Sequence, residues 1–182
     1  EARELTGPLP LRRRPDGFAA LLGAIVSQQV SVAAASAIWS RLEAAGATEP
    51  AALVLLSDEA LRGCGLSRQK VAYARALAAS RIDFEGLRTM PTEEVVATLT
   101  TVKGIGVWTA EIYAMFSLGR ADVFAPGDLA LQDATRLLFG LEARPREPAL
   151  RAMATEWSPW RAVAARLLWA YYRLQNQREG IR

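Results

Sequence analysis

Apolar residues recur at helical spacing along most of the chain. The first such segment covers residues 17–28, with Asp16 as its predicted N-cap. One side of this helix collects Phe18, Leu21, Leu22 and Ile25. No segment alternates apolar and polar residues with a period of two over a useful length, and no internal repeat is present. The pattern therefore predicts an all-α protein.

Capping and helix-breaking residues divide the rest of the chain into further helices, most of them short. They are expected over residues 31–44, 50–56, 57–62, 68–79, 84–90, 92–98, 129–140 and 147–156, from residue 107 onward, and from 159 to about 177. Ser67 and Thr92 are predicted N-caps, and Gly140 is predicted to end its helix.

For two of these helices, the sequence predicts which side chains face the core. In the helix over 68–79, the outer face is expected to carry Arg68, Lys70 and Arg75, and the inner face Val71, Ala74 and Leu77. A charged stripe of this kind is usually only a solvated face. The predicted core face of the last helix consists of Trp160, Val163, Ala164, Leu167, Leu168 and Tyr171.

Composition limits the classes of protein that remain. With 182 residues and 51% hydrophobic content, the chain can form one or two compact units with a proper core. Its net charge of +3 permits a nucleic-acid partner without demanding one. The chain has no histidine and one cysteine, Cys64, which excludes zinc sites, cysteine-bound iron–sulfur centres and nucleophiles activated by histidine. We expect Cys64 to be a small buried hydrophobic side chain.

The same inventory bears on location. A disulfide within the chain is impossible, which fits a reducing cytoplasm. No signal peptide is evident, and no apolar run reaches the roughly 18 residues of a membrane span. We therefore expect a cytoplasmic protein without a membrane partner. Residues 1–15 carry three prolines and the run Arg12-Arg13-Arg14, and are expected to form an irregular basic arm that is either a solvated tail or a phosphate contact.

A Gly-Ile-Gly sequence at residues 104–106 separates two predicted helices. Glycine can adopt positive φ and leaves backbone N–H groups accessible at the start of the following helix. Such a helix N-terminus attracts anions, and Lys103 adds a formal charge beside it. The segment is therefore either a phosphate-binding hairpin or a plain turn between helices.

Several blocks of sequence resemble one known superfamily. They are VKGIGVWTA (102–110), DVFAPGD (122–128), IVSQQVSVAAA (25–35), GLSRQKVAYARALA (65–78) and WSPWRAVAARLLWAYY (157–172). Together they resemble the helix-hairpin-helix DNA glycosylases, and most closely the 3-methyladenine DNA glycosylase II family. The resemblance implies a two-lobed, all-helical fold with the active cleft between the lobes. The best-known member of the family also carries an N-terminal sheet domain, which we do not expect here because the sequence offers no segment for it.

The resemblance also implies how the chain is divided. One lobe is expected to be a central helical domain over residues 30–131, with the helix-hairpin-helix at about 92–117. The other is expected to combine residues 16–29 and 132–182, from the two ends of the chain.

Asp128 is the predicted catalytic residue. It follows a Pro-Gly pair at the expected start of a helix, where the helix dipole helps to keep a carboxylate ionised. Hydrolysis of an N-glycosidic bond passes through a sugar with oxocarbenium character, which a carboxylate stabilises. An aspartate in this position can also be only an N-cap, and Asp122 and Asp133 are alternative acids.

Further site residues follow from the resemblance. Trp108 and Trp169 match aromatic pocket positions, and Tyr113 or Tyr172 extends the wall, whereas Ile112 stands where the family has another aromatic residue. Gln29 matches the residue that wedges into the duplex, and Gln28 faces the pocket or the orphaned base. Trp108 also occupies the position of the lysine nucleophile of bifunctional relatives, which implies a hydrolase without lyase activity.

The hairpin is expected to contact the DNA backbone. The residues assigned to this contact are Lys103, Gly104, Gly106, Val107, Thr109 and, on another helix, Lys70. The resemblance allows a structural Na⁺ or K⁺ bound by the backbone carbonyls of Thr100, Val102 and Ile105. No cofactor is required.

The resulting hypothesis is a monofunctional glycosylase of base excision repair. It flips alkylated purines such as 3-methyladenine or 7-methylguanine out of duplex DNA, hydrolyses them off and leaves an abasic site. We expect a monomer without an obligate protein partner, associated with DNA in a bacterial cytoplasm. The alternatives are a non-catalytic helix-hairpin-helix DNA-binding module, an oxidised-base glycosylase with lyase activity, and a purely structural helical protein.

Overall fold

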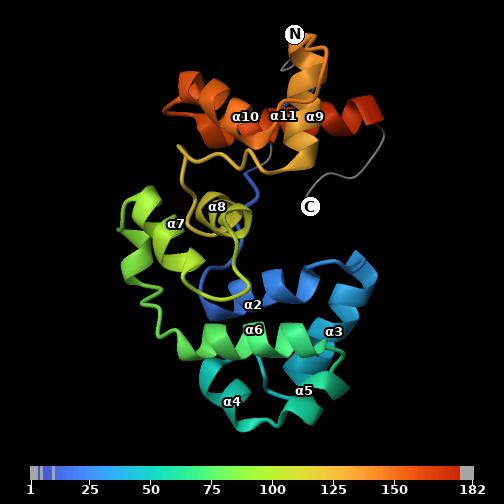
Figure 1. The fold of residues 1–182 in the computed structure, drawn as a ribbon, viewed down its shortest axis with the longest axis vertical. Helices are drawn as coiled ribbons and strands as arrows, with labels where there is room; N and C mark the ends of the chain where they lie inside the picture. The colour runs from blue at the N-terminus through green and yellow to red at the C-terminus, as the bar shows by residue number, and fades with distance from the viewer. Residues whose placement is uncertain (1–3, 5, 10, 177–182) are drawn as a thin grey trace. The chain divides into compact units, whose positions relative to one another are not determined.

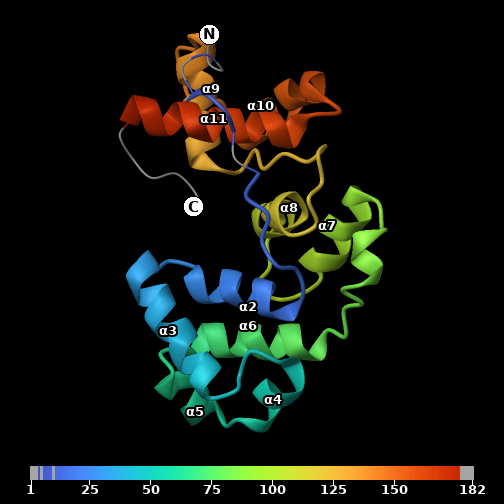
Figure 2. The ribbon, with the colours of Figure 1, turned by 180° about the vertical axis from the view of Figure 1, so that it is seen from behind.

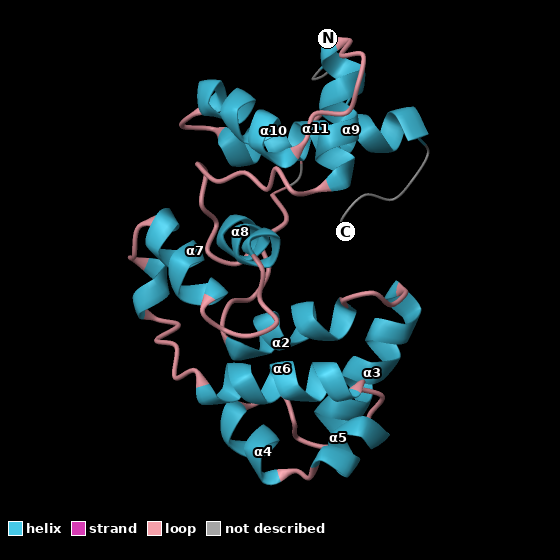
Figure 3. Cartoon of the chain, viewed as in Figure 1, coloured by secondary structure: helices cyan, strands magenta, loops and turns pink. Residues whose placement is uncertain are grey.

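A computed structural model describes residues 4, 6–9 and 11–176, which fold into helices joined by turns and loops (Figure 3). No strand occurs among these residues, which confirms the predicted all-α class. The α-helices are α2 (Phe18–Ser27), α3 (Val32–Ala44), α4 (Pro50–Leu55), α5 (Asp58–Gly63), α6 (Arg68–Ala79), α7 (Thr92–Thr100), α8 (Val107–Phe116), α9 (Leu129–Phe139), α10 (Glu147–Ala154) and α11 (Arg161–Asn176). Two short 3₁₀ helices, Gly86–Arg88 and Thr155–Trp157, are also present.

The chain divides into two compact units, and the boundary falls inside α8. One unit runs from Arg14 to Tyr113, and the other combines the described residues before Arg14 with those from Ala114 onward. This division differs from the predicted lobes, which placed residues 16–29 with the C-terminal end and 114–131 with the centre. The physical reason is the apolar face of α2, which packs against α6 and α3.

The unit from Arg14 to Tyr113 is built around α2 and α6, which lie side by side in both views (Figures 1 and 2). The predicted apolar side of α2 is buried, as are the inward residues of α6; these are Phe18, Leu21, Leu22, Ile25, Val71, Ala74 and Leu77. Ser67 caps α6 as predicted, because its Oγ accepts a hydrogen bond from the backbone N–H of Lys70. Cys64 is buried, also as predicted.

Three predicted helix starts or spans in this unit are wrong. The N-cap of α2 is Gly17 rather than Asp16, whose carboxylate instead accepts a hydrogen bond from Arg88 Nε at 2.7 Å. Thr92 is the first residue of α7 and not its cap. The expected helix over 84–90 shrinks to the 3₁₀ turn at Gly86–Arg88, because Pro91 follows and disfavours helical backbone at the preceding residue.

In the other unit, α9 packs against α11. The helix α9 ends at Gly140, whose φ of 63° provides the left-handed C-cap that the sequence predicted. The buried residues of α11 are Ala162, Ala165, Leu168, Trp169 and Ala170. The N-terminal segment of this unit includes Glu4 and Thr6, which have helical backbone. The arm predicted over residues 1–15 is therefore not irregular at these two positions. Gln177, the expected end of the last helix, lies outside the described residues.

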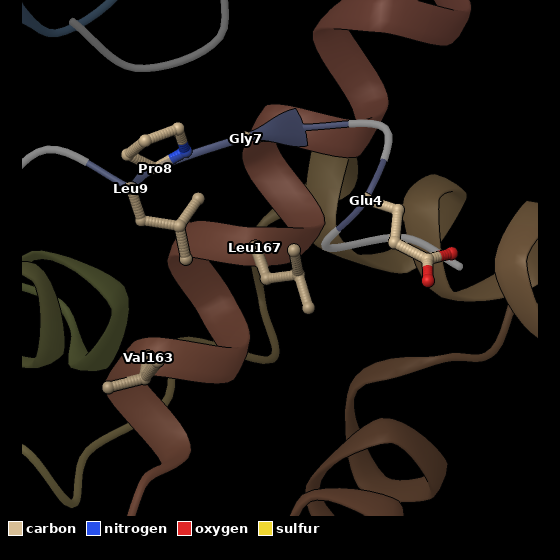
Figure 4. A pocket seen from close by; sticks show the side chains of 6 residues that line it. All are labelled: Glu4, Gly7, Pro8, Leu9, Val163 and Leu167. Carbon is tan, nitrogen blue, oxygen red and sulfur yellow. The ribbon is translucent and has the colours of Figure 1, made fainter.

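The predicted core face of α11 is partly wrong. Trp160 is 62% exposed and Val163 is 44% exposed. Val163 and Leu167 instead line an apolar pocket together with Pro8 and Leu9 of the N-terminal segment (Figure 4). The helical spacing correctly groups these side chains on one apolar face. It contains no information on how much of that face other parts of the protein cover. The pocket contains none of the predicted site residues.

Candidate active site

Asp128 begins α9 and is held by hydrogen bonds to one of its two oxygens. Its Oδ1 accepts from the backbone N–H of Ala130 at 2.9 Å and of Leu131 at 3.1 Å. It also accepts from the indole Nε1 of Trp169 at 3.1 Å. The side chain is buried. Asp128 therefore caps the helix, and it is also a carboxylate fixed in one orientation at the positive end of the helix dipole.

Trp169 lies in the core of the same unit, where it contacts Asp128 across 41 residues of sequence. Its ring packs against Phe116, with the ring centroids 5.6 Å apart and the planes tilted by 33°. The guanidinium of Arg166 lies 5.0 Å from the centre of the Phe116 ring on the same aromatic cluster. Packing thus directs the indole N–H at the carboxylate. The sequence predicted Trp169 as part of the base pocket and contained no sign of this hydrogen bond.

The two alternative acids are held by arginines. Asp122 accepts hydrogen bonds from Arg161 Nε at 2.6 Å and Nη2 at 2.9 Å, and a third from Ser158 Oγ. These bonds from Arg161 lower the pKa of Asp122 to about 2. Asp133 forms a longer ion pair with Arg144, at 3.5 Å. A carboxylate tied to a guanidinium in this way is a poor candidate for stabilising a substrate cation, so the geometry favours Asp128.

The hairpin between α7 and α8 needs glycine at one position and tolerates other residues at the second. Gly104 has φ of +96°, and a Cβ there would overlap the ring of Tyr73 on α6. Gly106 lacks positive φ, and a Cβ there would meet no atom within 4 Å. The predicted requirement for glycine at positive φ therefore holds at Gly104. At Gly106, the absence of a side chain leaves the N-terminus of α8 accessible.

The predicted cation ligands belong to the same turn. The carbonyl of Val102 accepts a hydrogen bond from the N–H of Ile105 at 3.0 Å, and both side chains are buried. Thr100 is the last residue of α7. Among the described residues, no group of three acidic, histidine or cysteine side chains is placed to hold a metal ion. A monovalent cation on these carbonyls stays a prediction.

The turn between α2 and α3 carries the two glutamines. Gln29 is exposed and has φ of +55°, which is rare for a residue with a side chain. The Gln28 side chain donates from Nε2 to the carbonyl of Gly104 at 3.0 Å. This bond ties the amide nitrogen of Gln28 to the hairpin, and the predicted role of Gln28 at a base pocket or the orphaned base stays a prediction.

The aromatic residues near the hairpin have different environments. Trp108, in the first turn of α8, is 40% exposed, whereas Ile112 one turn later is buried. Tyr113 is also buried, and its hydroxyl accepts a hydrogen bond from the N–H of Gly17 at 2.8 Å. This burial raises the pKa of Tyr113. Of the two pocket candidates on α8, Trp108 keeps an accessible surface, and Tyr113 serves the core of its unit.

The predicted backbone contacts separate into exposed and buried groups. Lys103 and Val107 are exposed, while Thr109 is buried. The prediction that Lys70 lies on the outer face is wrong, because this side chain is buried and its Nζ donates to the carbonyl of Val26 at 2.7 Å. Arg75, from the same predicted face, pairs with Asp58 at 2.7 Å.

A family model covers most of the chain. The model of the HhH-GPD superfamily base excision DNA repair proteins matches residues 22–160, which include the hairpin and Asp128. The chain belongs to the HhH-GPD superfamily. This match confirms the resemblance seen in the sequence blocks, and the all-helical fold agrees with solved members of the superfamily.

Individual relatives are similar over nearly the whole chain. The crystal structure of a DNA-3-methyladenine glycosidase from Bacillus halodurans has a TM-score of 0.88 at 37% identity, covering 97% of this chain and 84% of that one. The Schizosaccharomyces pombe 3-methyladenine DNA glycosylase Mag1, solved in complex with abasic DNA, has a TM-score of 0.78 at 27% identity, covering 100% and 92%. In sequence, DNA-3-methyladenine glycosylase 1 of S. pombe is 29% identical over 178 residues, 93% of this chain and 78% of its own length.

Among the described residues, no helix is both long and apolar enough to cross a membrane.

Proposed function

We propose that this member of the HhH-GPD superfamily is a DNA-3-methyladenine glycosylase. It removes alkylated bases from duplex DNA in base excision repair and leaves an abasic site. The observation that carries the proposal is the buried carboxylate of Asp128 at the N-terminus of α9, whose Oδ1 accepts hydrogen bonds from Ala130, Leu131 and Trp169. The names of the similar glycosylases support the choice of alkylated bases.

Asp128 supplies electrostatic stabilisation in the proposed reaction. As the bond between the base and the deoxyribose breaks, positive charge develops on the sugar, and a fixed carboxylate lowers the energy of that state. The same carboxylate orients the attacking water or accepts its proton. An alkylated purine already carries positive charge and leaves readily, so the base requires little acid catalysis. An aromatic surface such as that of Trp108 attracts a cationic base by about 0.5 to 2 kcal/mol.

The absence of a lysine nucleophile on α8 supports a hydrolytic mechanism. Trp108 occupies the place at which bifunctional relatives carry that lysine, and Lys103 lies before α8 in the hairpin. Hydrolysis leaves the DNA strand intact, whereas a Schiff base would lead to strand cleavage. We therefore expect strand breaks in methylated duplex DNA only after alkali treatment of the product. A covalent protein–DNA adduct after borohydride reduction would contradict this mechanism.

Trp169→Phe is expected to slow base excision about tenfold at saturating DNA, which corresponds to the loss of one hydrogen bond to a charged group. Phenylalanine keeps the packing against Phe116 but lacks the indole N–H that Asp128 Oδ1 accepts. Two backbone donors still hold the carboxylate, so the fold is kept. The melting temperature is expected to fall moderately, because the smaller ring leaves a space at a buried position. Single-turnover rates measure the effect. Trp157→Phe is the matched control because its ring packs against Phe124 and Phe139, and an equal loss in both variants would remove Trp169 from the mechanism.

Lys103 and Lys70 are expected to differ in the salt dependence of DNA binding. The logarithm of the DNA-binding constant falls linearly as the logarithm of the salt concentration rises. Lys103→Ala makes this negative slope shallower by about one, because an exposed phosphate contact releases about one counterion. Lys70→Met leaves the slope unchanged, because the Lys70 ammonium is buried on a backbone carbonyl. Fluorescence anisotropy over a salt series measures both slopes. A shallower slope for Lys70→Met would restore the original prediction of a phosphate contact.

A further inference from the structure

The turn that carries Gln29 is held at two points by side-chain hydrogen bonds. On one side, Gln28 Nε2 donates to the carbonyl of Gly104 in the hairpin, at 3.0 Å. On the other, Lys70 Nζ donates to the carbonyl of Val26 near the end of α2, at 2.7 Å. Both bonds span long stretches of sequence, 76 and 44 residues, and both lie within the unit from Arg14 to Tyr113.

The backbone of Gln29 is strained, so it depends on its surroundings. A φ of +55° places a residue with a side chain in the left-handed region, which costs of order 1–3 kcal/mol unless neighbouring structure holds it. Gln29 is exposed and its immediate neighbour Val30 is 39% exposed, so packing of the turn itself contributes little. The hydrogen bonds of Gln28 and Lys70 supply the missing constraint.

Lys70 is an expensive residue to bury. An ammonium group loses favourable hydration in the interior, and burial accordingly lowers the pKa of Lys70. The carbonyl of Val26 lies at the C-terminal end of α2, where the helix dipole favours a cation. An apolar side chain could fill the same space without the free-energy cost of burying a charge. The hydrogen bond to the carbonyl of Val26 is what a lysine adds at this position.

The helix that carries Lys70 also supports the hairpin. Tyr73, one turn later on α6, lies against Gly104 so closely that a Cβ on the glycine would overlap its ring. Successive turns of α6 therefore contact the end of α2 and the hairpin, and Gln28 joins these two segments directly. The result is a closed set of contacts among the Gln29 turn, α6 and the hairpin.

We infer that Gln28 and Lys70 are positioning residues that hold the Gln29 turn in register with the phosphate-binding hairpin. The inference rests on the proposed function and on two expectations drawn from the family resemblance: the hairpin contacts the DNA backbone, and Gln29 enters the space left by the flipped base. Insertion at a defined site requires that these two elements keep a fixed spacing. Gln28 and Lys70 act only through that spacing and contact neither the base nor the phosphate.

The test uses the full chain and a duplex with a stable abasic analogue opposite 2-aminopurine, whose fluorescence rises when a wedge unstacks it. The variants are Gln28→Leu, Gln29→Gly and the double variant. Leucine removes the amide of Gln28 at similar size, and glycine removes the Gln29 side chain while accepting its positive φ. Gln175→Leu, an exposed change on α11 in the other unit, is the matched control. Circular dichroism and melting curves verify folding.

The expected result is a non-additive cycle. Gln28→Leu lowers the equilibrium constant for the unstacked state about five- to tenfold, the effect of one hydrogen bond lost at a strained turn. Gln29→Gly removes the fluorescence rise, and the double variant behaves as Gln29→Gly does. A full fluorescence rise in Gln28→Leu would overturn the inference. A double variant that binds the duplex more weakly than Gln29→Gly would do the same, because Gln28 would then contact the DNA on its own.

Lys70→Met provides a second variant should Gln28→Leu fold poorly. It is expected to reduce the fluorescence rise while leaving the salt slope of binding unchanged, and a normal rise would overturn the role of Lys70. Failure of the proposed function gives a different pattern. In that case the fluorescence cycle follows the expected order, but the wild-type protein releases no base from methylated DNA. If the wild-type protein produces no fluorescence rise, the inference itself is wrong.

Discussion

Asp128→Asn is expected to slow base excision by about a hundred- to ten-thousandfold, the range for loss of a group that stabilises charge or transfers a proton at the transition state. Asparagine has the same shape and is an equally good N-cap. Its side-chain oxygen can still accept from the N–H groups of Ala130 and Leu131 and from Trp169. The substitution removes the negative charge and replaces Oδ2 with an NH2 donor. Because the cap bonds on Oδ1 can be kept, folding and DNA affinity are expected to stay close to those of the wild-type protein.

Three measurements separate the effect of Asp128→Asn on excision from its effects on DNA affinity and on folding. Single-turnover excision measures the chemical step, binding to abasic DNA measures affinity, and thermal melting measures the cap. Asp122→Asn is the matched control, because Asp122 is held by Arg161 in the same unit. Excision that survives in Asp128→Asn and is lost in Asp122→Asn would reverse the assignment of the acid.

Gly104→Ala and Gly106→Ala are expected to weaken DNA binding for different reasons. Alanine at Gly104 requires an unfavourable positive φ and overlaps Tyr73, so it lowers the free energy of unfolding by about 2 to 4 kcal/mol and distorts the hairpin. At Gly106 a Cβ fits without contact, so stability changes by less than about 0.5 kcal/mol. Its methyl group instead obstructs the approach of a phosphate to the N-terminus of α8.

Urea unfolding and anisotropy titrations of both variants test this contrast. Gly104→Ala should lose stability and affinity together, and Gly106→Ala should lose affinity alone. Gly63→Ala is a suitable control, because a Cβ there also meets no atom within 4 Å and the residue is remote in sequence from the hairpin. Normal DNA affinity in Gly106→Ala would mean that the phosphate does not approach this part of the backbone.

Local patterns predicted much of the fold. The apolar side of α2, the Ser67 cap and the Gly140 helix end depend on residues close together in sequence, and all three are confirmed. Some errors occur where a distant partner competes for a side chain, and others where a distant partner expected from the pattern is missing. Asp16 was predicted to cap its own helix, but it pairs with Arg88 instead. Trp160 has the spacing of a core residue, and no packing partner covers it enough to bury it.

The candidate site shows the same division. The place of Asp128 at a helix start follows from the preceding Pro-Gly pair, and the structure agrees. The indole of Trp169 could be assigned to a pocket by resemblance, but its hydrogen bond to Asp128 depends on how α11 packs against α9. The burial of Lys70 was also beyond reach, because helical periodicity places a lysine on a charged stripe and contains no information about the carbonyl of Val26.

Release of free base from methylated DNA directly tests whether this protein is a glycosylase of alkylated bases. The wild-type protein is incubated with duplex DNA treated with a methylating agent, and the supernatant is resolved by chromatography. We expect free 3-methyladenine or 7-methylguanine in the wild-type reaction, with abasic sites left in an intact strand. Binding to the same DNA without release of any base would show that the protein is a DNA-binding module and not a glycosylase.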